Sequence, residues 1–278
     1  MGEPLLVVED LSVDFPTRAR LVRAVRGVSF ALGREKLAIV GESGSGKSVT
    51  GRAVLGLVPK PGQVRAKTLA FDGVDLLRAS ARDRRRLRGR RMALVMQDPK
   101  FSLNPVMTVG AQIGEALRAS GLSRRERRDR VAAMLEAVRI RDPAHVARSY
   151  PHELSGGMGQ RAMIAMMLAA EPDLLVADEP TSALDVTVQA EVLAILDDLV
   201  TRRGMGLIFI SHDLRLVSRF CDRVLVMYAG RVLETCRAAD LEAARHPYTQ
   251  GLYRCLPRLD RGGEPLPVLE RDPGWIDG

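Results

Sequence analysis

The sequence predicts an α/β fold that has a mostly parallel sheet, an antiparallel β subdomain at the N-terminus and an inserted helical subdomain. Over residues 5–41, short apolar runs alternate with turns, which indicates strands. Over residues 98–168, amphipathic segments replace the strand patterns. From residue 173 onward, apolar strands alternate with helical patterns, as they do in a parallel sheet that helices cover on both faces.

The individual elements follow from apolar periodicity and from the turn residues between them. Strands are expected at 5–15, 24–32, 36–41, 68–77, 173–180 and 206–213, with a turn at Asp72-Gly73 inside the fourth. Helices are expected at 49–58, 109–119, 123–138, 156–169, 186–202 and 214–220. Residues 223–235 predict a hairpin that turns at Ala229-Gly230, and the tail from Pro257 is expected to pack loosely.

Length and composition indicate a globular protein, because 278 residues that are 46% hydrophobic can bury a large core. We expect one main domain over residues 1–257, with its helical subdomain at about 98–168, and a C-terminal tail over 258–278. The apolar runs are too short or too charged to cross a bilayer, and "MGEPLLVVEDL" at the N-terminus lacks the pattern of a signal peptide. The sequence therefore predicts a cytoplasmic location.

The formal charge of +8 raises the question of nucleic-acid binding. The densest basic runs, "RDRRRLRGRR" (82–91) and "SRRERRDR" (123–130), lack aromatic residues for base stacking. The second run also mixes charge signs, as the solvated face of a helix does. We therefore expect no nucleic-acid partner, and a position beside an anionic membrane surface suits the same charge.

The chain has three cysteines, Cys221, Cys236 and Cys255, which are widely spaced and odd in number. This pattern fits neither a disulfide framework nor a zinc site. We interpret the three side chains as ordinary packing or surface thiols.

A phosphate-binding loop is the strongest motif in the sequence. The stretch "GESGSGKS" matches G-x-x-x-x-G-K-[ST] and lies between an apolar strand and a helical pattern, as this motif requires. Glycines let backbone N–H groups converge on phosphates, lysine supplies a charge, and serine can bind Mg²⁺. The sequence thus predicts the core of a P-loop NTPase, with nucleotide-binding residues Gly41, Glu42, Ser43, Gly44, Ser45, Gly46, Lys47, Ser48 and Val49.

Polar side chains also follow three other apolar strands. "LLVADEP" ends in Asp178, placed to hold Mg²⁺, and in Glu179, which can accept a proton from an attacking water. Gln97 ends "ALVMQ", and His212 follows "LIFIS". Each of these last two could simply cap a strand, but the coincidence of four polar strand ends favours a shared γ-phosphate site.

These residues occur in an order that resembles the nucleotide-binding subunit of ATP-binding cassette (ABC) transporters. The ordered motifs are "GESGSGKS", "MQDP", "LSGGM", "LLVADEP", "SALD" and "ISHD", and the resemblance covers about residues 5–257. It implies ATP and Mg²⁺ as ligands and two subunits that face head to tail. Each ATP is then held between the phosphate loop of one subunit and the signature "LSGGM" of the other.

The resemblance also implies roles for individual residues. Glu179 is the catalytic base, His212 contacts the γ-phosphate, and Gln97 senses nucleotide and couples to the membrane partner. Ser48, Gln97 and Asp178 hold Mg²⁺, and Ser182–Asp185 cross the dimer interface. Residues Ser155, Gly156, Gly157 and Asp185 complete the partner's site, with Ser155 as the cap of a helix that begins at Gly156.

Two predictions concern single residues. Phe15, in "SVDF", is a candidate for the aromatic ring that stacks on adenine, although it could equally belong to the core. Gly159 occupies a place after the signature methionine where related proteins commonly have a basic residue. Because glycine costs about 1 kcal/mol relative to alanine inside a helix, we expect a softer first turn there.

Three further segments are similar to ATPases of the oligopeptide, dipeptide and nickel importers. They are "MQDPKFSLNPVMTVGAQIGEAL", "SYPHELSGGMGQRAMIAMML" and "RHPYTQGLYRCLP", of which "HPYTQGL" at 246–252 is the most branch-specific. The resemblance implies transmembrane permease subunits, a second ATPase of a different or the same kind, and an external solute-binding protein as an indirect partner. It places the chain peripherally at the cytoplasmic face of the inner membrane. Some members carry a cysteine-rich extension for an iron–sulfur cluster, and this chain is expected to have no such cluster.

Other classes of protein share parts of this pattern. DNA-repair and chromosome ATPases separate the two halves by long coiled coils, and the interval from Lys47 to Ser155 is too short for one. Translation factors carry tandem cassettes, whereas a single phosphate loop occurs here. A regulatory nucleotide sensor is disfavoured by Glu179. The transported solute is left open by the sequence.

Overall fold

Two units make up the chain, and each is described by itself. The computed structural model describes residues 3–97, 102–182, 184–255, 269, 272 and 274–277. Unit one comprises Met1–Arg78 and Ile208–Gly278, and unit two comprises Ala79–Leu207. The helical subdomain predicted at about 98–168 falls within unit two, which also contains two strands.

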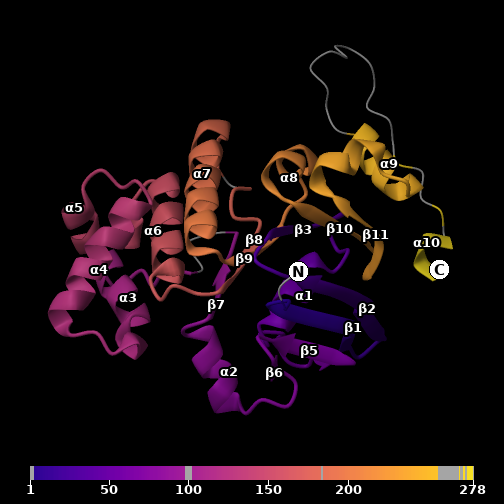
Figure 1. Ribbon diagram of the computed structural model, residues 1–278, viewed down its shortest axis with the longest axis horizontal. Coiled ribbons are helices and arrows are strands. Elements are labelled where there is room, and N and C mark those ends of the chain that lie inside the picture. Colours follow the sequence, from indigo (N-terminus) through magenta and orange to yellow (C-terminus); the bar gives the residue numbers. More distant parts are fainter. Residues whose placement is uncertain are drawn as a thin grey trace. The chain divides into compact units, whose positions relative to one another are not determined.

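An antiparallel sheet occupies the N-terminal part of unit one (Figure 1). Its strands pair in the order β2-β1-β5-β6, with β4 beside β1, and all these pairings are antiparallel. The sheet confirms the predicted N-terminal subdomain, including the turn at Asp72-Gly73, where both residues have positive φ angles of 47° and 74°. The strands are β1 (Leu6–Pro16), β2 (Leu21–Leu32), β4 (Gln63–Arg65), β5 (Thr68–Phe71) and β6 (Val74–Asp75).

The second group of strands in unit one includes the strand that leads into the phosphate loop. In this group β3 (Lys36–Val40) runs parallel to β10 (Arg223–Tyr228), and β11 (Arg231–Arg237) pairs antiparallel with β10. Ala229 and Gly230 have φ angles of 46° and 87°, the left-handed pair that a tight hairpin requires, so the predicted turn is confirmed. The helices of this unit are α1 (Lys47–Val54), α8 (Leu214–Phe220), η4 (Ala238–Ala243), α9 (Pro247–Arg254) and α10 (Gly274–Asp277).

Unit two combines two parallel strands with a group of helices. Strands β7 (Met92–Val95) and β8 (Leu174–Asp178) pair in parallel, and all five residues of β8 are buried. The chain then returns to unit one within β9 (Gly206–Ile210). Helices α3, α4, α5 and α6 pack together, as Figure 1 shows. The helices are α2 (Ala81–Arg88), α3 (Val109–Ala116), η2 (Arg118–Ser120), α4 (Arg124–Ala137), α5 (Pro143–Arg148), η3 (Pro151–Glu153), α6 (Gly156–Leu168) and α7 (Val186–Arg203).

The predicted α/β class is thus confirmed, because parallel pairs in both units accompany the antiparallel N-terminal sheet. Within the described residues, none of the helices combines the length and the apolar character needed to cross a membrane. The thiol of Cys221 is buried, and those of Cys236 and Cys255 are half-buried. Burial of Cys221 agrees with a packing role.

Some elements differ from the prediction for identifiable reasons. Helix α1 spans Lys47–Val54 rather than 49–58, because Leu55 closes it and Gly56 follows with a φ of 62°. Helix α2 buries no residue and therefore leaves no apolar periodicity in the sequence. Helix α5 has only six residues, too few for a periodic pattern, and is started by Asp142 and by a proline in its first turn.

Part of the tail is better packed than the sequence predicts. The ring of Trp275, in α10, lies 5.9 Å from the ring of Tyr228 and 5.6 Å from that of Tyr248. Aromatic edge-to-face contacts of this kind stabilise the position of a short helix. Within the ordered motifs, Asp98 and Pro99 of "MQDP" and Ala183 of "SALD" lie outside the described residues.

Candidate active site

The phosphate loop in unit one connects β3 to α1, as predicted. Gly41, Gly44 and Gly46 have φ angles of 147°, 81° and 100°, which side chains other than glycine rarely adopt. A Cβ atom at Gly41 would lie 2.1 Å from the Met227 carbonyl oxygen, and one at Gly46 would lie 2.4 Å from that of Ala24. Glycine is therefore required at these two positions both by conformation and by contact.

Lys47 holds the loop closed. Its side chain is 6% exposed, and its Nζ donates hydrogen bonds of 2.8 Å to the carbonyl oxygens of both Gly41 and Glu42. Ser45 Nα–H donates to the same Glu42 oxygen at 3.2 Å. A buried ammonium group requires such compensation, and the two carbonyl groups keep its charge beside the loop.

Several features of the loop fit a phosphate ligand. The hydroxyl of Ser45 is buried and has no hydrogen-bond partner among the described residues. A Cβ at Gly44 would meet nothing within 4 Å, so space adjoins the left-handed backbone there. Ser43 and Gly44 are exposed, whereas Glu42, Ser48 and Val49 are half-buried at the loop and the start of α1. The backbone N–H groups of a glycine-rich loop and the N-terminus of α1 together suit an anion.

His212 lies at the same sheet edge as the loop. The backbone N–H of Ser211, just after β9, donates to the carbonyl oxygen of Ile39 in β3 at 3.2 Å. The exposed His212 and the loop that starts at Gly41 therefore follow the same ends of two neighbouring strands. This placement is the one that a γ-phosphate contact needs.

Phe15, at the end of β1, is half-buried. A Cβ atom at Gly62 would lie 2.7 Å from Phe15 Cε1, so the ring packs against the chain at Gly62. Packing on one side leaves part of the ring accessible. Both interpretations of Phe15, adenine stacking and core packing, remain predictions.

In unit two, the acidic pair lies at the end of the buried strand β8. Asp178 is 8% exposed, and Glu179 follows it with a φ of 49°. This left-handed conformation costs a non-glycine residue about 1 kcal/mol, and such strain is concentrated at functional sites. Val95 of β7 pairs in parallel with Ala177 of β8, so the two strands end at the same edge of the sheet. The exposed Gln97 therefore follows β7 at the edge where the acidic pair ends β8.

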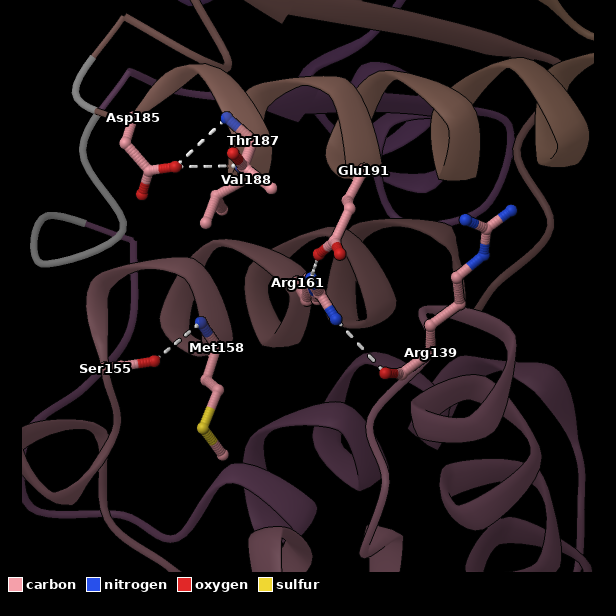
Figure 2. A network of polar contacts seen from close by, with 8 residues as sticks. All are labelled: Arg139, Ser155, Met158, Arg161, Asp185, Thr187, Val188 and Glu191. Carbon is pink, nitrogen blue, oxygen red and sulfur yellow. Dashed lines mark hydrogen bonds and ion pairs between the residues drawn. The ribbon is translucent and has the colours of Figure 1, made fainter.

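The signature forms the N-terminus of α6, and Ser155 is its N-cap as predicted. Ser155 Oγ accepts a hydrogen bond from Met158 N–H at 3.3 Å. Asp185 caps α7 in the same manner, since its Oδ1 accepts from the N–H groups of Thr187 and Val188 at 3.1 and 3.0 Å. Figure 2 shows these two capped helix starts side by side.

Glycine at position 157 allows the two helix starts to approach each other. A Cβ atom there would lie 2.7 Å from Val188 Cγ1, whereas one at Gly156 would meet nothing within 4 Å. Gly159 is buried, and its N–H donates to Ser155 O at 2.8 Å, so the first turn of α6 is hydrogen-bonded. Whether Gly159 softens this turn remains a prediction.

A pocket of about 350 Å³ opens where the two helices begin. Two helix N-termini concentrate partial positive charge, which favours an anion. Arg161 contributes to the lining, forms an ion pair with Glu191 and donates to Arg139 O at 3.1 Å (Figure 2). The pocket is lined by Ser155, Gly156, Gly157, Met158, Arg161, Leu184, Asp185 and Val188.

Two residues of this region were given no role by the sequence. Arg161 lines the pocket, and Gln160 is 1% exposed and donates from Nε2 to the carbonyl oxygen of Pro180, which follows Glu179. Both follow Gly159, the residue after the signature, in "SGGMGQR". Their partners lie 20 or more residues away, so no local pattern indicates the contacts.

The donors available for Mg²⁺ are few. Within the described residues, no group of three or more His, Cys, Asp or Glu side chains is arranged to hold a metal ion. Mg²⁺ commonly binds through one or two protein oxygens together with substrate phosphates. The hydroxyl of Ser48 at the start of α1 and the carboxylate of Asp178 at the end of β8 are donors of this type.

Comparisons with known proteins agree with the geometry. Residues 25–182 match the sequence family described as ABC transporter. The chain is 48% identical to the dipeptide transport ATP-binding protein DppD of Escherichia coli, over 99% of this chain and 84% of that protein. It is 47% identical to the oligopeptide transport ATP-binding protein OppD of Bacillus subtilis, over 94% of this chain and 74% of that protein.

Solved structures show the same fold. A dimeric ATP-binding cassette in a post-hydrolysis state with ADP and Pi superposes with a TM-score of 0.74 and 25% identity, over 84% of this chain and 98% of that one. The structure of cbiO1 from Clostridium perfringens, described as part of the ABC transporter complex cbiONQ, gives a TM-score of 0.73 and 28% identity, over 87% of this chain and 92% of that one. Motif order, fold and sequence identity therefore agree, and the chain belongs to the ABC transporter family.

Proposed function

We propose that this chain hydrolyses ATP to power the import of peptides, or of a related solute such as a nickel complex, through a membrane ABC transporter. The observation that carries the proposal is the similarity of the chain, over nearly its whole length, to dipeptide and oligopeptide transport ATP-binding proteins. The same chain contains a closed phosphate loop and a pocket at two helix N-termini. These are the two halves that a composite ATP site requires.

Nucleotide binding is assigned to the phosphate loop. Its backbone N–H groups and the N-terminus of α1 bind the phosphates, and Lys47 exchanges its carbonyl partners for phosphate oxygens. Ser48, Asp178 and Gln97 would hold Mg²⁺, which, when bound, neutralises charge on the phosphates. Phe15 is the candidate for stacking on adenine.

Hydrolysis is assigned to the polar residues at the strand ends. Glu179 takes a proton from the attacking water and orients it, and the strained backbone at this residue supports that role. His212 donates to the γ-phosphate oxygen that gains charge. The N–H groups at the start of α6, capped by Ser155, stabilise the γ-phosphate of the partner subunit's ATP.

The transporter is proposed to contain a second cassette, of a different or the same kind, and transmembrane permease subunits. Asp185 and its neighbours form the interface with the second cassette. The chain then lies peripherally at the cytoplasmic face of the membrane, and an external solute-binding protein delivers the solute. ATP binding closes the cassette dimer and hydrolysis reopens it, which drives the permease.

Purification from native membranes tests this proposal. A tagged full-length chain should recover permease subunits and a second cassette, and the recovered complex should hydrolyse ATP. Vesicles that contain it should take up a labelled dipeptide only when ATP is supplied. The variant Lys47→Ala should assemble normally but bind MgATP about a hundredfold more weakly, because hydrogen bonds from a charged group are lost.

Two outcomes would contradict the proposal. Nucleotide binding without turnover in the complete complex would identify a regulatory sensor instead. Recovery of the chain without any membrane subunit, under conditions that preserve other transporters, would exclude a transport role.

A further inference from the structure

The branch-specific segment "HPYTQGL" (246–252) places one tyrosine in the interior of unit one. Tyr248 is fully buried at the start of α9. Its ring lies 4.7 Å from the ring of Tyr228, in β10, and 5.6 Å from that of Trp275, in α10. A phenol that is buried in this way needs partners for its hydroxyl group.

The hydroxyl of Tyr248 finds its partners at the phosphate loop. Glu42 N–H donates to Tyr248 Oη at 3.2 Å, and the hydroxyl faces Met227 O at 3.5 Å. Met227 O is also the atom that a side chain at Gly41 would meet. Tyr248 therefore contacts both the loop and the strand against which the loop packs.

Residue 42 is thereby held by its N–H as well as by its carbonyl group. The carbonyl oxygen accepts from Lys47 Nζ and from Ser45 N–H, and the amide donates to Tyr248. In the proposed nucleotide complex, Lys47 turns to the phosphates and releases the first of these contacts. The bond to Tyr248 does not involve Lys47, so it can persist in both states.

The residues around "HPYTQGL" fix the start of α9. His246 caps the helix, since its Nδ1 accepts from Tyr248 N–H at 3.1 Å, and Pro247 occupies the first turn. The carboxylate of Glu234, in β11, accepts from the N–H groups of Arg245 and His246 at 2.7 and 3.2 Å. Besides the ring contacts, the capped start of α9 and the carboxylate of Glu234 in β11 therefore set the position of the phenol.

We propose that Tyr248 is a positioning residue for the phosphate loop and holds it in the conformation that binds nucleotide. The inference rests on the proposed nucleotide binding. If only a fraction of the unbound molecules had the loop in its binding conformation, the affinity for nucleotide would fall by that fraction. A loop that is already in this conformation avoids the loss. Trp275, which contacts the same phenol, is then placed to report nucleotide binding at the loop, and it is the single tryptophan of the sequence.

The test compares Tyr248→Phe with the matched control Tyr228→Phe in the full chain. Both substitutions keep an aromatic ring in the same cluster and remove one hydroxyl. Calorimetric titration with MgADP should give about fivefold weaker binding for Tyr248→Phe and unchanged binding for Tyr228→Phe. In the assembled ATPase, KM for MgATP should rise about fivefold in Tyr248→Phe while kcat stays nearly constant.

Two further measurements separate positioning from a general loss of stability. Hydrogen exchange of a peptide that covers residues 41–48, in nucleotide-free protein, should be faster in Tyr248→Phe and unchanged in Tyr228→Phe. MgADP should change Trp275 fluorescence in the wild-type protein, with a smaller change in Tyr248→Phe. Neither difference follows if the variant simply lowers the melting temperature.

The outcomes also distinguish this inference from the proposed function. If the wild-type chain fails to bind MgADP, the proposed function fails and the inference with it. If the wild-type chain binds MgADP and Tyr248→Phe binds it equally well, only the inference is overturned. Equal weakening in both variants would likewise overturn it, because ring-cluster packing rather than the hydroxyl would then set the affinity.

Discussion

Gln160 of the signature helix α6 donates a hydrogen bond to the carbonyl oxygen of Pro180, the residue that follows Glu179. The signature helix is thus tied directly to the backbone that carries the proposed catalytic base. Because Glu179 adopts a left-handed conformation with a φ of 49°, its backbone needs such support to stay in place. Within unit two, a contact at the pocket can therefore affect the position of Glu179.

We expect Gln160→Leu to lower kcat about tenfold, since a misplaced base loses part of its contribution. The affinity for MgADP should not change, because the phosphate loop belongs to unit one. Gln112→Leu is the matched control: Gln112 is also buried and donates to the carbonyl oxygens of Asn104 and Met107, in a different part of the unit. Equal losses of kcat in both variants would argue against the link to Glu179.

Gly157 and Val188 give a second prediction. The substitution Gly157→Ala should lower ATP hydrolysis, because its Cβ would lie 2.7 Å from Val188 Cγ1 and push the two helix starts apart. Val188→Ala removes the opposing methyl groups, so the double variant should recover much of the activity. Turnover of the two single variants and of the double variant measures this coupling. No recovery in the double variant would show that the close contact is not the cause.

Ser155→Arg tests the pocket itself. The arginine would fill the exposed start of α6 and remove the cap, which costs about 1 kcal/mol of helix stability. Nucleotide binding should stay near normal, whereas hydrolysis should be abolished, since the damage falls on the ATP held by the other subunit. Equilibrium binding and turnover are measured on the same preparation. A loss of binding itself would contradict this division of labour.

Glycine patterns, helix caps and strand ends made much of the site predictable from sequence. The phosphate loop, the cap Ser155 and the hairpin turn at Ala229 all depend on neighbouring residues, and local patterns indicate them. The bond between Glu42 and Tyr248 joins residues 206 positions apart. No periodicity carries information about such a contact, which arises only when the elements pack.

The same distinction explains the elements that the sequence did not predict. Helix α2 buries none of its residues, so no apolar face indicates it in the sequence, and the Ser80 side chain caps its start. The left-handed conformation of Glu179 is imposed by its surroundings and contradicts its intrinsic preference. Trp275 packs because an aromatic cluster from β10 and α9 is present to receive it.

Cys221 gives a prediction about pH. Burial raises the pKa of its thiol to about 12, although the nearby Lys36 ammonium acts in the opposite direction. In the unfolded chain the thiol ionises at about pH 8.5, so as the pH rises the unfolded state loses this proton before the folded state does. The contribution of Cys221 to stability is therefore complete below that pH and is lost as the pH rises toward 12.

Alkylation and unfolding measurements check this expectation. Iodoacetamide should leave Cys221 unmodified in the folded protein at about pH 8.5, and should modify it after unfolding in urea. The stability difference between wild type and Cys221→Ala should shrink as the pH rises further. Rapid alkylation of Cys221 in the folded chain would contradict its burial.

The central claim is that ATP is held between two cassettes, and sedimentation of Glu179→Gln tests it most directly. This variant should bind MgATP but fail to hydrolyse it, so the closed dimer should accumulate. The experiment is run on the variant alone and with the second cassette recovered from the native membrane, because either can complete the site. The account predicts an ATP-dependent dimer in at least one of the two samples, absent with Lys47→Ala in the same background. Monomers in both samples with ATP bound, or hydrolysis by Glu179→Gln at the wild-type rate, would contradict it.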